Sequence, residues 1–416
     1  MNTHIKKITG VSSNTERAEA TVVPFSPVFI GSGDKYYKGI DFFCHGGQTC
    51  LFDHQKIFKE FLNDLDNLEQ ALGKKDLATF LKARGKNLQN YVKLQWNGEV
   101  KGRDLAAPLT DGFGHPLLPG SSLKGSIRTA LFADFFRRRK ISAVQYEKLI
   151  SRGKVGDKRL NSRLLTTWSG GQKKTGSEAN YDLGRALRVG DATFSPSDTE
   201  IFHTIIANET YRGFRWKKSK QRSHQKERSL ETAARTSLAR TSLAALSCDS
   251  NTIRPVPLTL SIDRSALKHI GWKEPFTFQT IACACNRLSK KLIELELDYL
   301  KEAAQDLTEL DAAITKYTYL LKNVEASINE LKTTNKINWF QRVGWGSGWL
   351  SITGAHAYAG DDSEIDYIDI LRKKASFLFR RTGNLEYPKT RKVVLDQDGK
   401  PAMGMGWVYV EINDIN

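Results

Sequence analysis

The stretch from Pro119 to Leu131 constrains the fold of this chain more than any other. Pro119 and the glycine after it end whatever precedes them. Ser121 or Ser122 is predicted to cap a helix, because a serine oxygen accepts a hydrogen bond from a free N–H of the first turn. From Leu123 the apolar residues recur at helical spacing, so the sequence predicts a helix that runs on to about residue 140.

This predicted helix begins with features of an anion site. Lys124 and Arg128 are four residues apart and share one face of the helix. A glycine-serine turn that enters a helix beside two cations can bind a phosphate, and Gly120 and Gly125 lie in that turn and the first helical turn. A capped helix with a solvated basic face explains the same pattern about equally well. ATP binding is disfavoured, because a Walker A loop needs Ser or Thr after its lysine and Gly125 stands there.

The charge balance predicts a polyanionic partner. Lys and Arg number 63 against 46 Asp and Glu, for a formal net charge of +17. Nucleic acid is the first candidate, and an anionic membrane surface is the competitor. No apolar segment is long enough to span a bilayer, and the first residues lack the apolar core of a signal peptide. Five cysteines form no disulfide framework in so long a chain, so we expect a cytoplasmic protein.

A zinc site is weighed at Cys44, His45, Cys50 and His54, which lie close together in the sequence. Their spacing is not that of a standard zinc knuckle, so loop and strand roles without a ligand function are favoured. The sequence therefore predicts neither a metal ion nor a cofactor.

Two further segments suit RNA. Gly31, Ser32 and Gly33 are predicted to form a tight loop in which backbone approaches a ligand closely, with a plain hairpin turn as the alternative. Residues 211–240 form a basic arm with few acids, in which cations interleave with aromatic rings that stack on bases. The RNA-binding candidates of this arm are Arg212, Arg215, Trp216, Lys217 and Lys218. A disordered basic linker is the alternative, and both hold if the arm orders on RNA.

The periodicity of apolar residues predicts an α+β fold with a domain boundary near residue 250 and a loose tail at residues 1–20. Strands are predicted at 22–30, 186–194, 201–206, 253–262, 276–282 and 407–412, and helices at 57–72 and from 76. A heptad stripe runs from Leu300 to Leu331. Packing of a long helix or a helical hairpin on the core is favoured over a self-associating coiled coil, because the stripe is short and holds Ala and Tyr.

Residues 119–131 closely resemble the signature segment of RAMP proteins, the RNA-binding backbone subunits of CRISPR effector complexes. Other segments follow in the family's order: residues 27–33 resemble its first strand and loop, 187–194 the strand after the signature helix, and 344–348 its glycine-rich loop. Residues 387–392 with 406–408 resemble the C-terminus of the fifth Csm subunit of type III-A systems. The resemblance runs from about residue 20 to the end, with long unmatched insertions.

The resemblance implies two ferredoxin-like, RRM-like βαββαβ domains. The first would span residues 21–250 and include the basic arm, and the second would span 251–416 with a long helical region at about 286–332. It further implies an RNA-binding subunit that holds CRISPR RNA (crRNA) toward its 3′ end, caps the backbone filament and supports crRNA maturation. Target RNA, the repeated backbone subunit, other Csm subunits and host nucleases that trim crRNA would be partners. The RNA-binding candidates that it adds are Gly344, Gly346, Gly348, Lys389 and Arg391.

The alternative function is a RAMP-type endoribonuclease that acts on precursor crRNA or target RNA. Some RAMP relatives cut guide precursors, and the repeated backbone subunit cuts target RNA with an aspartate in an N-terminal loop. Asp34 follows a predicted loop of that kind. A lone Asp after Gly-Ser-Gly is more often a turn residue that bonds its own backbone, and no acid–base partner is visible in the sequence. We therefore expect no catalysis by this chain, with Asp34 as the residue to test.

Overall fold

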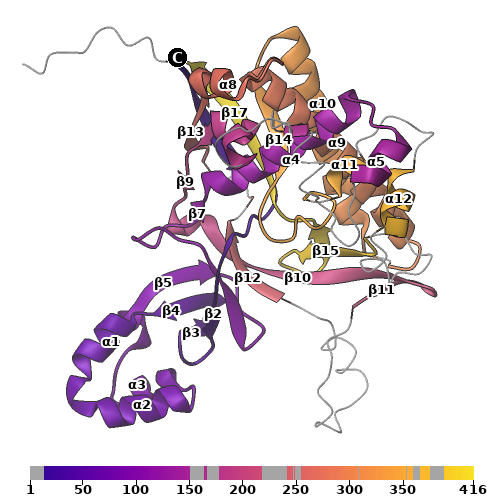
Figure 1. The fold of residues 1–416 in the computed structure, drawn as a ribbon. Helices are drawn as coiled ribbons and strands as arrows, with labels where there is room; N and C mark the ends of the chain where they lie inside the picture. The colour runs from indigo at the N-terminus through magenta and orange to yellow at the C-terminus, as the bar shows by residue number, and fades with distance from the viewer. Residues whose placement is uncertain are drawn as a thin grey trace, which may run out of the picture.

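The structure is a computed structural model that describes residues 14–149, 164–165, 178–217, 241–246, 248, 254–307, 309–352, 354–358, 366–374 and 388–416. Helices and strands are both abundant in these residues, which confirms the α+β class (Figure 1). No helix among the described residues is long and apolar enough to cross a membrane.

One antiparallel sheet organises the body of the molecule. Its strand order is β14 (Asn338–Arg342), β17 (Trp407–Ile415), β1 (Thr15–Pro24), β13 (Val256–Asp263) and β8 (Leu187–Val189). Helix α4 (Gly120–Arg138) lies between β1 and β8 in the chain, and α9 (Phe278–Ala303) lies between β13 and β17. Leaving out the edge strand β14, this is the strand order of a ferredoxin-like βαββαβ unit.

The strands of this sheet come from both sides of the expected domain boundary. β1 pairs antiparallel with β13 and with β17, so that Val22 lies opposite Val256 on one side and Val410 on the other. The division at residue 250 therefore does not separate the strands of this sheet, and the ferredoxin-like order that the described strands form combines both halves of the chain. The expected tail is also shorter than residues 1–20, because β1 begins at Thr15 and buries Ala18 and Ala20.

A second, longer sheet has a different strand order. Its main path is β2 (Gly31–Tyr37), β6 (Asp104–Pro108), β12 (Thr241–Leu246), β10 (Thr199–Thr210), β5 (Val92–Asn97), β4 (Gln48–Phe52) and β3 (Phe42–His45). β10 also pairs with β11 (Gly213–Trp216) and β15 (Thr390–Leu395), and β15 pairs with β16 (Pro401–Met403). A short ladder joins β7 (Leu117–Leu118) to β9 (Ala192–Thr193).

Part of the second sheet projects from the body as a lobe. Strands β2 to β5 carry α1 (His54–Glu60), α2 (Leu65–Gly73) and α3 (Leu77–Ala83) at the far end of this lobe (Figure 1). The predicted helix at 57–72 is thus two helices with a 3-10 turn between them. α3 begins after Asp76, in agreement with the helix predicted from residue 76, and the Asp76 side chain accepts the Thr79 N–H.

The main core lies between the five-stranded sheet and its helices. Alternate residues of β1 face apolar side chains of α4 and α9, including Leu123, Ile127 and Ile281. Burial of each such side chain contributes roughly 1.5–3 kcal/mol. Other helices of the body are α5 (Ala143–Leu149), α8 (Arg264–Ile270), α11 (Ala355–Tyr358) and α12 (Tyr367–Lys374).

The heptad stripe belongs to a helical hairpin on the core. α9 packs against α10 (Asp311–Thr333), and the stripe residues Leu300, Tyr317 and Val324 are buried in the main core, as the favoured interpretation predicts. The strand predicted at 276–282 is wrong. Thr277 and Thr280 form a capping box that starts α9 at Phe278, so this local polar signal outweighs the short alternation of apolar residues.

Candidate nucleic-acid interface

The start of α4 packs against residues 189–191, which lie at the end of β8 and just before β9. The Gly120 N–H donates to Asp191 Oδ1 at 2.7 Å, and a Cβ built on Gly120 would lie only 2.0 Å from the Val189 carbonyl oxygen. Pro119, not Ser121 or Ser122, is the N-cap, and it offers no side-chain hydrogen bond. A carboxylate at a helix N-terminus is favourable. The chain's own Asp191 therefore occupies the position predicted for a phosphate.

One turn further on, Lys124 and Arg128 differ in how they are paired. Arg128 donates to Asp182 Oδ2 at 2.6 Å, and the same carboxylate accepts the Gly184 N–H. Lys124 is half-buried beside this pair, with no ion pair to any described carboxylate. Burial lowers the pKa of Lys124, and the nearby Arg128 and Arg188 lower it further against the opposing effect of Asp182. Lys124 is thus a desolvated cation that an incoming anion would stabilise.

The other RNA-binding candidates on the first turns of α4 differ in their exposure to solvent. Ser121 and Gly125 are exposed and Ser122 is half-buried on the first two turns of α4. A small pocket lies against the face of α4 that carries Lys124 and Arg128. It is lined by Lys124, Arg128, Leu131, Leu165, Leu183, Gly184, Leu187 and Phe276. The exposed backbone near Gly125 leaves room for a ligand, since a Cβ there would meet nothing within 4 Å.

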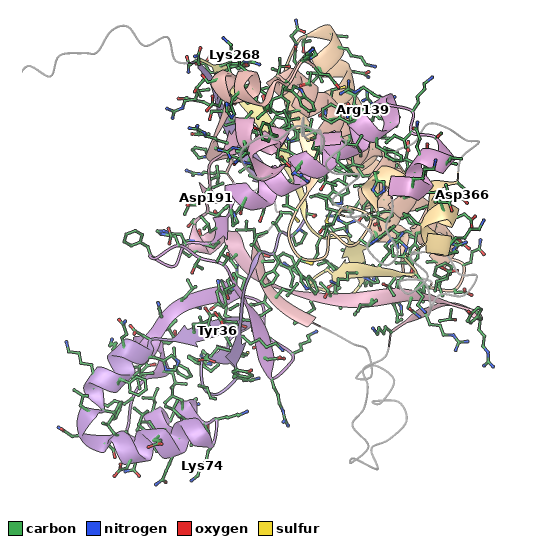
Figure 2. All side chains as sticks on the ribbon, viewed as in Figure 1. Tyr36, Lys74, Arg139, Asp191, Lys268 and Asp366 are labelled. Atoms are coloured by element: carbon green, nitrogen blue, oxygen red, sulfur yellow. The ribbon has the colours of Figure 1, made fainter. Side chains whose placement is uncertain are left out.

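The opposite end of α4 is electrostatically satisfied. Asp191 lies near the start of the helix and Arg139 at its end (Figure 2). Arg138 and Arg139 both pair with Glu274, and Arg138 also pairs with Asp134. The arginine run at residues 137–139 is therefore held by carboxylates of the chain, whereas Lys124 near the start of the helix forms no ion pair with a carboxylate of the described residues.

The segment Gly31-Ser32-Gly33 is not the predicted tight loop. All three residues belong to the exposed strand β2, which pairs with β6 through a bulge between Gly31 and Lys35. Gly33 has φ +97°, a backbone conformation that suits glycine. The Asp34 N–H donates to Ser32 Oγ at 3.2 Å, so the serine makes the local turn bond.

The basic arm begins as an ordered hairpin. Residues Gly213–Trp216 form β11 on the edge of β10. Phe214 is buried against Tyr299 and Trp216 is half-buried on the core, so their rings stabilise the fold. The alternative prediction of a disordered basic linker is therefore wrong for residues 211–217. Arg212, Arg215 and Lys217 are exposed on this hairpin. Lys218 and the arm up to residue 240 lie outside the described residues.

The glycine-rich loop packs closely on neighbouring backbone. Gly344, Gly346 and Gly348 have φ of +73°, +93° and +77°. The Trp345 N–H donates to the Phe29 carbonyl at 2.9 Å, and a Cβ on Gly344 would lie 2.5 Å from that same oxygen. The close approach that Gly344 permits is thus made to Phe29 and Ile30, whereas a Cβ on Gly346 would lie 3.2 Å from Met405 Cβ.

The two C-terminal candidates have different environments. Arg391 is 9% exposed, and its Nε lies 2.9 Å from Glu296 Oε2, so it is a buried structural residue and not a surface RNA contact. Lys389 is half-buried, and its carbonyl accepts from the Glu209 N–H and the Tyr299 hydroxyl. Sequence reasoning missed Lys392, which lies on the opposite face of β15 over the Trp345 ring. Because successive side chains of a strand point to opposite faces of the sheet, the sequence already indicates that Arg391 and Lys392 lie on different faces of β15.

The residues that were weighed as zinc ligands and disfavoured do not form a metal site in the described part of the chain. Cys44 and Cys50 lie on the paired strands β3 and β4, but Cys50 joins a hydrophobic cluster with Phe43 and Cys44 packs against a different one. His54 Nε2 lies 3.4 Å from Asp41 Oδ1. In the described part of the chain, no group of three or more His, Cys, Asp or Glu side chains could hold a metal ion.

A family model described as the RAMP superfamily matches residues 22–308, more than half of the chain. The chain belongs to the RAMP superfamily. This RAMP protein also shares its fold with one chain of a cryo-EM structure of a Csm–crRNA–target RNA ternary complex from a type III-A CRISPR–Cas system. The TM-score is 0.60 at 16% sequence identity, over 95% of this chain and 100% of that chain. No curated protein matches the sequence.

The pairing of the two α4 cations leads to a prediction for this RAMP protein. Lys124→Ala is expected to weaken binding of single-stranded RNA about fivefold at 0.1 M salt and to lower the slope of log affinity against log salt by about 0.7, the loss of one phosphate contact. Binding titrations at several salt concentrations test this. Lys316→Ala, the same charge change at an exposed site on α10, is the control. Equal slopes for the two folded variants would contradict a phosphate contact at Lys124.

Proposed function

We propose that this RAMP protein is an RNA-binding structural subunit of a type III-A Csm effector complex. The observation that carries the proposal is the fold shared with a chain of such a complex over the full length of that chain. The net charge of +17 supports RNA as a ligand, and so does the half-buried Lys124 on the signature helix, which pairs with no carboxylate among the described residues. In RNA-guided complexes base pairing reads the target, while protein holds the backbone and shape of the guide.

The position within the complex is the finer part of the proposal. The chain would bind crRNA toward its 3′ end, cap the backbone filament and support crRNA maturation in the cytoplasm. The resemblance of residues 387–392 and 406–408 to the fifth Csm subunit supports this position. The repeated backbone subunit, other Csm subunits, target RNA and trimming nucleases of the host would be its partners.

We further propose that the chain holds RNA without cutting it. Asp34 is exposed on β2, and within the described residues its carboxylate makes no hydrogen bond to an acid or base. The neighbouring Lys35 pairs with Asp104 at 2.5 Å. A single solvated carboxylate without a positioned partner lacks the geometry of an acid–base site.

Purification of the assembled complex from its host tests all three parts of the proposal. The tagged chain is expected to bring down Csm subunits and crRNA, and deletion of the chain is expected to shorten the protected guide from its 3′ side. Asp34→Ala should leave every target cut in place, as should Asp398→Ala, an exposed control on the β15–β16 turn. Loss of one terminal cut in Asp34→Ala alone, with assembly intact by native mass measurement, would support the endoribonuclease instead. Recovery of unrelated RNA and no Csm subunit would refute the proposal.

A further inference from the structure

The helical end of the lobe has a hydrophobic core of its own. Ile57 of α1, Phe61 at the bend that follows it and Leu68 of α2 are buried in one cluster, which also contains Phe80 of α3. Spacings of four and seven residues place Ile57, Phe61 and Leu68 on one face of the helical segment. This inner face holds the three helices together at the end of the lobe (Figure 1).

The adjacent face of the same segment is also apolar, but it is uncovered. Phe58, Leu62 and Leu65 are 42%, 61% and 46% exposed. They follow one another at spacings of four and three residues, and the 3-10 turn that begins at Leu62 keeps residues three apart on the same side. We call these three residues the outer stripe. Large apolar side chains that gather on one surface mark interaction sites, whereas single scattered ones do not.

The charges around the outer stripe indicate what kind of partner it fits. Asp66 and Glu69 are exposed on α2 beyond Leu65, and α2 contains no Lys or Arg. Neither carboxylate forms an ion pair with any described residue. Lys59 is exposed beside Phe58, so the two ends of the stripe carry charges of opposite sign. RNA is disfavoured as the partner, because its phosphates would be repelled at the acidic end and leucines do not stack on bases.

We propose that the outer stripe is a docking site for a second protein, which offers an apolar groove with a Lys or Arg opposite Asp66 and Glu69 and a carboxylate opposite Lys59. Apolar anchors at helical spacing that enter a groove are a common mode of protein recognition. The stripe is free for this role because the lobe already buries its inner face. The inference goes beyond the proposed function and does not depend on RNA binding by the chain.

Photo-crosslinking in the assembly purified from the host tests the docking site. A benzophenone amino acid is placed at position 62 of the full chain. The same amino acid at position 144 is the control, because Val144 on α5 is likewise apolar and is 59% exposed. We expect a crosslink from position 62, and not from position 144, to an apolar segment of another protein that has Lys or Arg beside it. A crosslink to RNA, to a second copy of this chain or to no molecule would overturn the proposal.

Affinity measurements with the crosslinked protein provide the second readout. Leu62→Ser together with Leu65→Ser should weaken its binding to the full chain about tenfold or more, because apolar anchors in a groove carry most of the binding energy. Val144→Ser should leave the affinity unchanged. Both variants should melt at the wild-type temperature, since the replaced side chains are exposed.

A charge exchange tests the predicted rim of the groove. Glu69→Lys should weaken binding, and replacing the facing base of the partner by Glu should restore it. Wild-type affinity in the folded double-serine variant, or no rescue by the exchanged charge, would overturn the docking site. Neither result would affect the proposed function, which is tested separately by recovery of Csm subunits and crRNA.

Discussion

Replacing Glu296 by Ala is expected to lower the free energy of unfolding by about 3–5 kcal/mol, because it leaves buried charges without a partner. Glu296 is 4% exposed on α9 and is the carboxylate that pairs with both Arg342 of β14 and Arg391 of β15. The ion pairs thus join one helix to a strand from each of the two sheets. Their loss would also loosen the glycine-rich loop, since Arg342 donates to the Gly346 carbonyl.

Denaturant unfolding of the purified chain measures this effect, and a close neighbour provides the control. Glu294 lies on the same helix, but its side chain is 39% exposed and its carboxylate is 4.0 Å from Lys290. Glu294→Ala should therefore change stability by less than about 1 kcal/mol. Glu296→Gln, which keeps the size and removes the charge, should also be destabilised. Similar small losses for Glu294→Ala and Glu296→Ala would show that the buried pairs add little to the fold.

Gly120→Ala is expected to destabilise the protein by about 3 kcal/mol, at the upper end of the cost of overpacking. A Cβ at this position would lie 2.0 Å from the Val189 oxygen and 2.5 Å from the Gly190 oxygen. Both contacts are to backbone, so no side-chain rotation relieves them. The helix start would have to move away from β8 and break the hydrogen bond from Gly120 to Asp191.

The matched control lies one turn further along the same helix. Gly125 is exposed within α4, and a Cβ there would meet nothing within 4 Å. Gly125→Ala should raise the free energy of unfolding by roughly 0.5–1 kcal/mol, because alanine restricts the unfolded chain and favours the helix. Thermal unfolding of the two variants should thus shift in opposite directions. A stable Gly120→Ala protein would mean that the signature glycine is not required for packing against β8.

Short-range features of this protein follow from its sequence. The signature helix, the start of α3 after Asp76 and the strands β10, β13 and β17 lie where periodicity and local polar residues predict them, although the N-cap of the signature helix is Pro119 and not Ser121 or Ser122. Each of these features depends on residues within about one or two turns of the chain, so local patterns suffice. The apolar stripe favours packing of a long helix or a helical hairpin on the core over a self-associating coiled coil, and the structure has the hairpin of α9 and α10.

The burial and charge pairing of the candidate site residues depend on tertiary contacts, which local sequence patterns do not contain. Arg391 and Lys392 are adjacent in the sequence, yet one is buried on Glu296 and the other lies over Trp345. The Asp191 carboxylate accepts a hydrogen bond from the Gly120 N–H at the start of α4, the position at which the sequence predicts a bound phosphate. Strands from both halves of the chain form one sheet, so a boundary predicted near residue 250 from the periodicity of apolar residues has no counterpart in the strand pairing. Residue types and their periods identify candidate cations, but only the tertiary structure decides which of them are already neutralised by carboxylates of the chain.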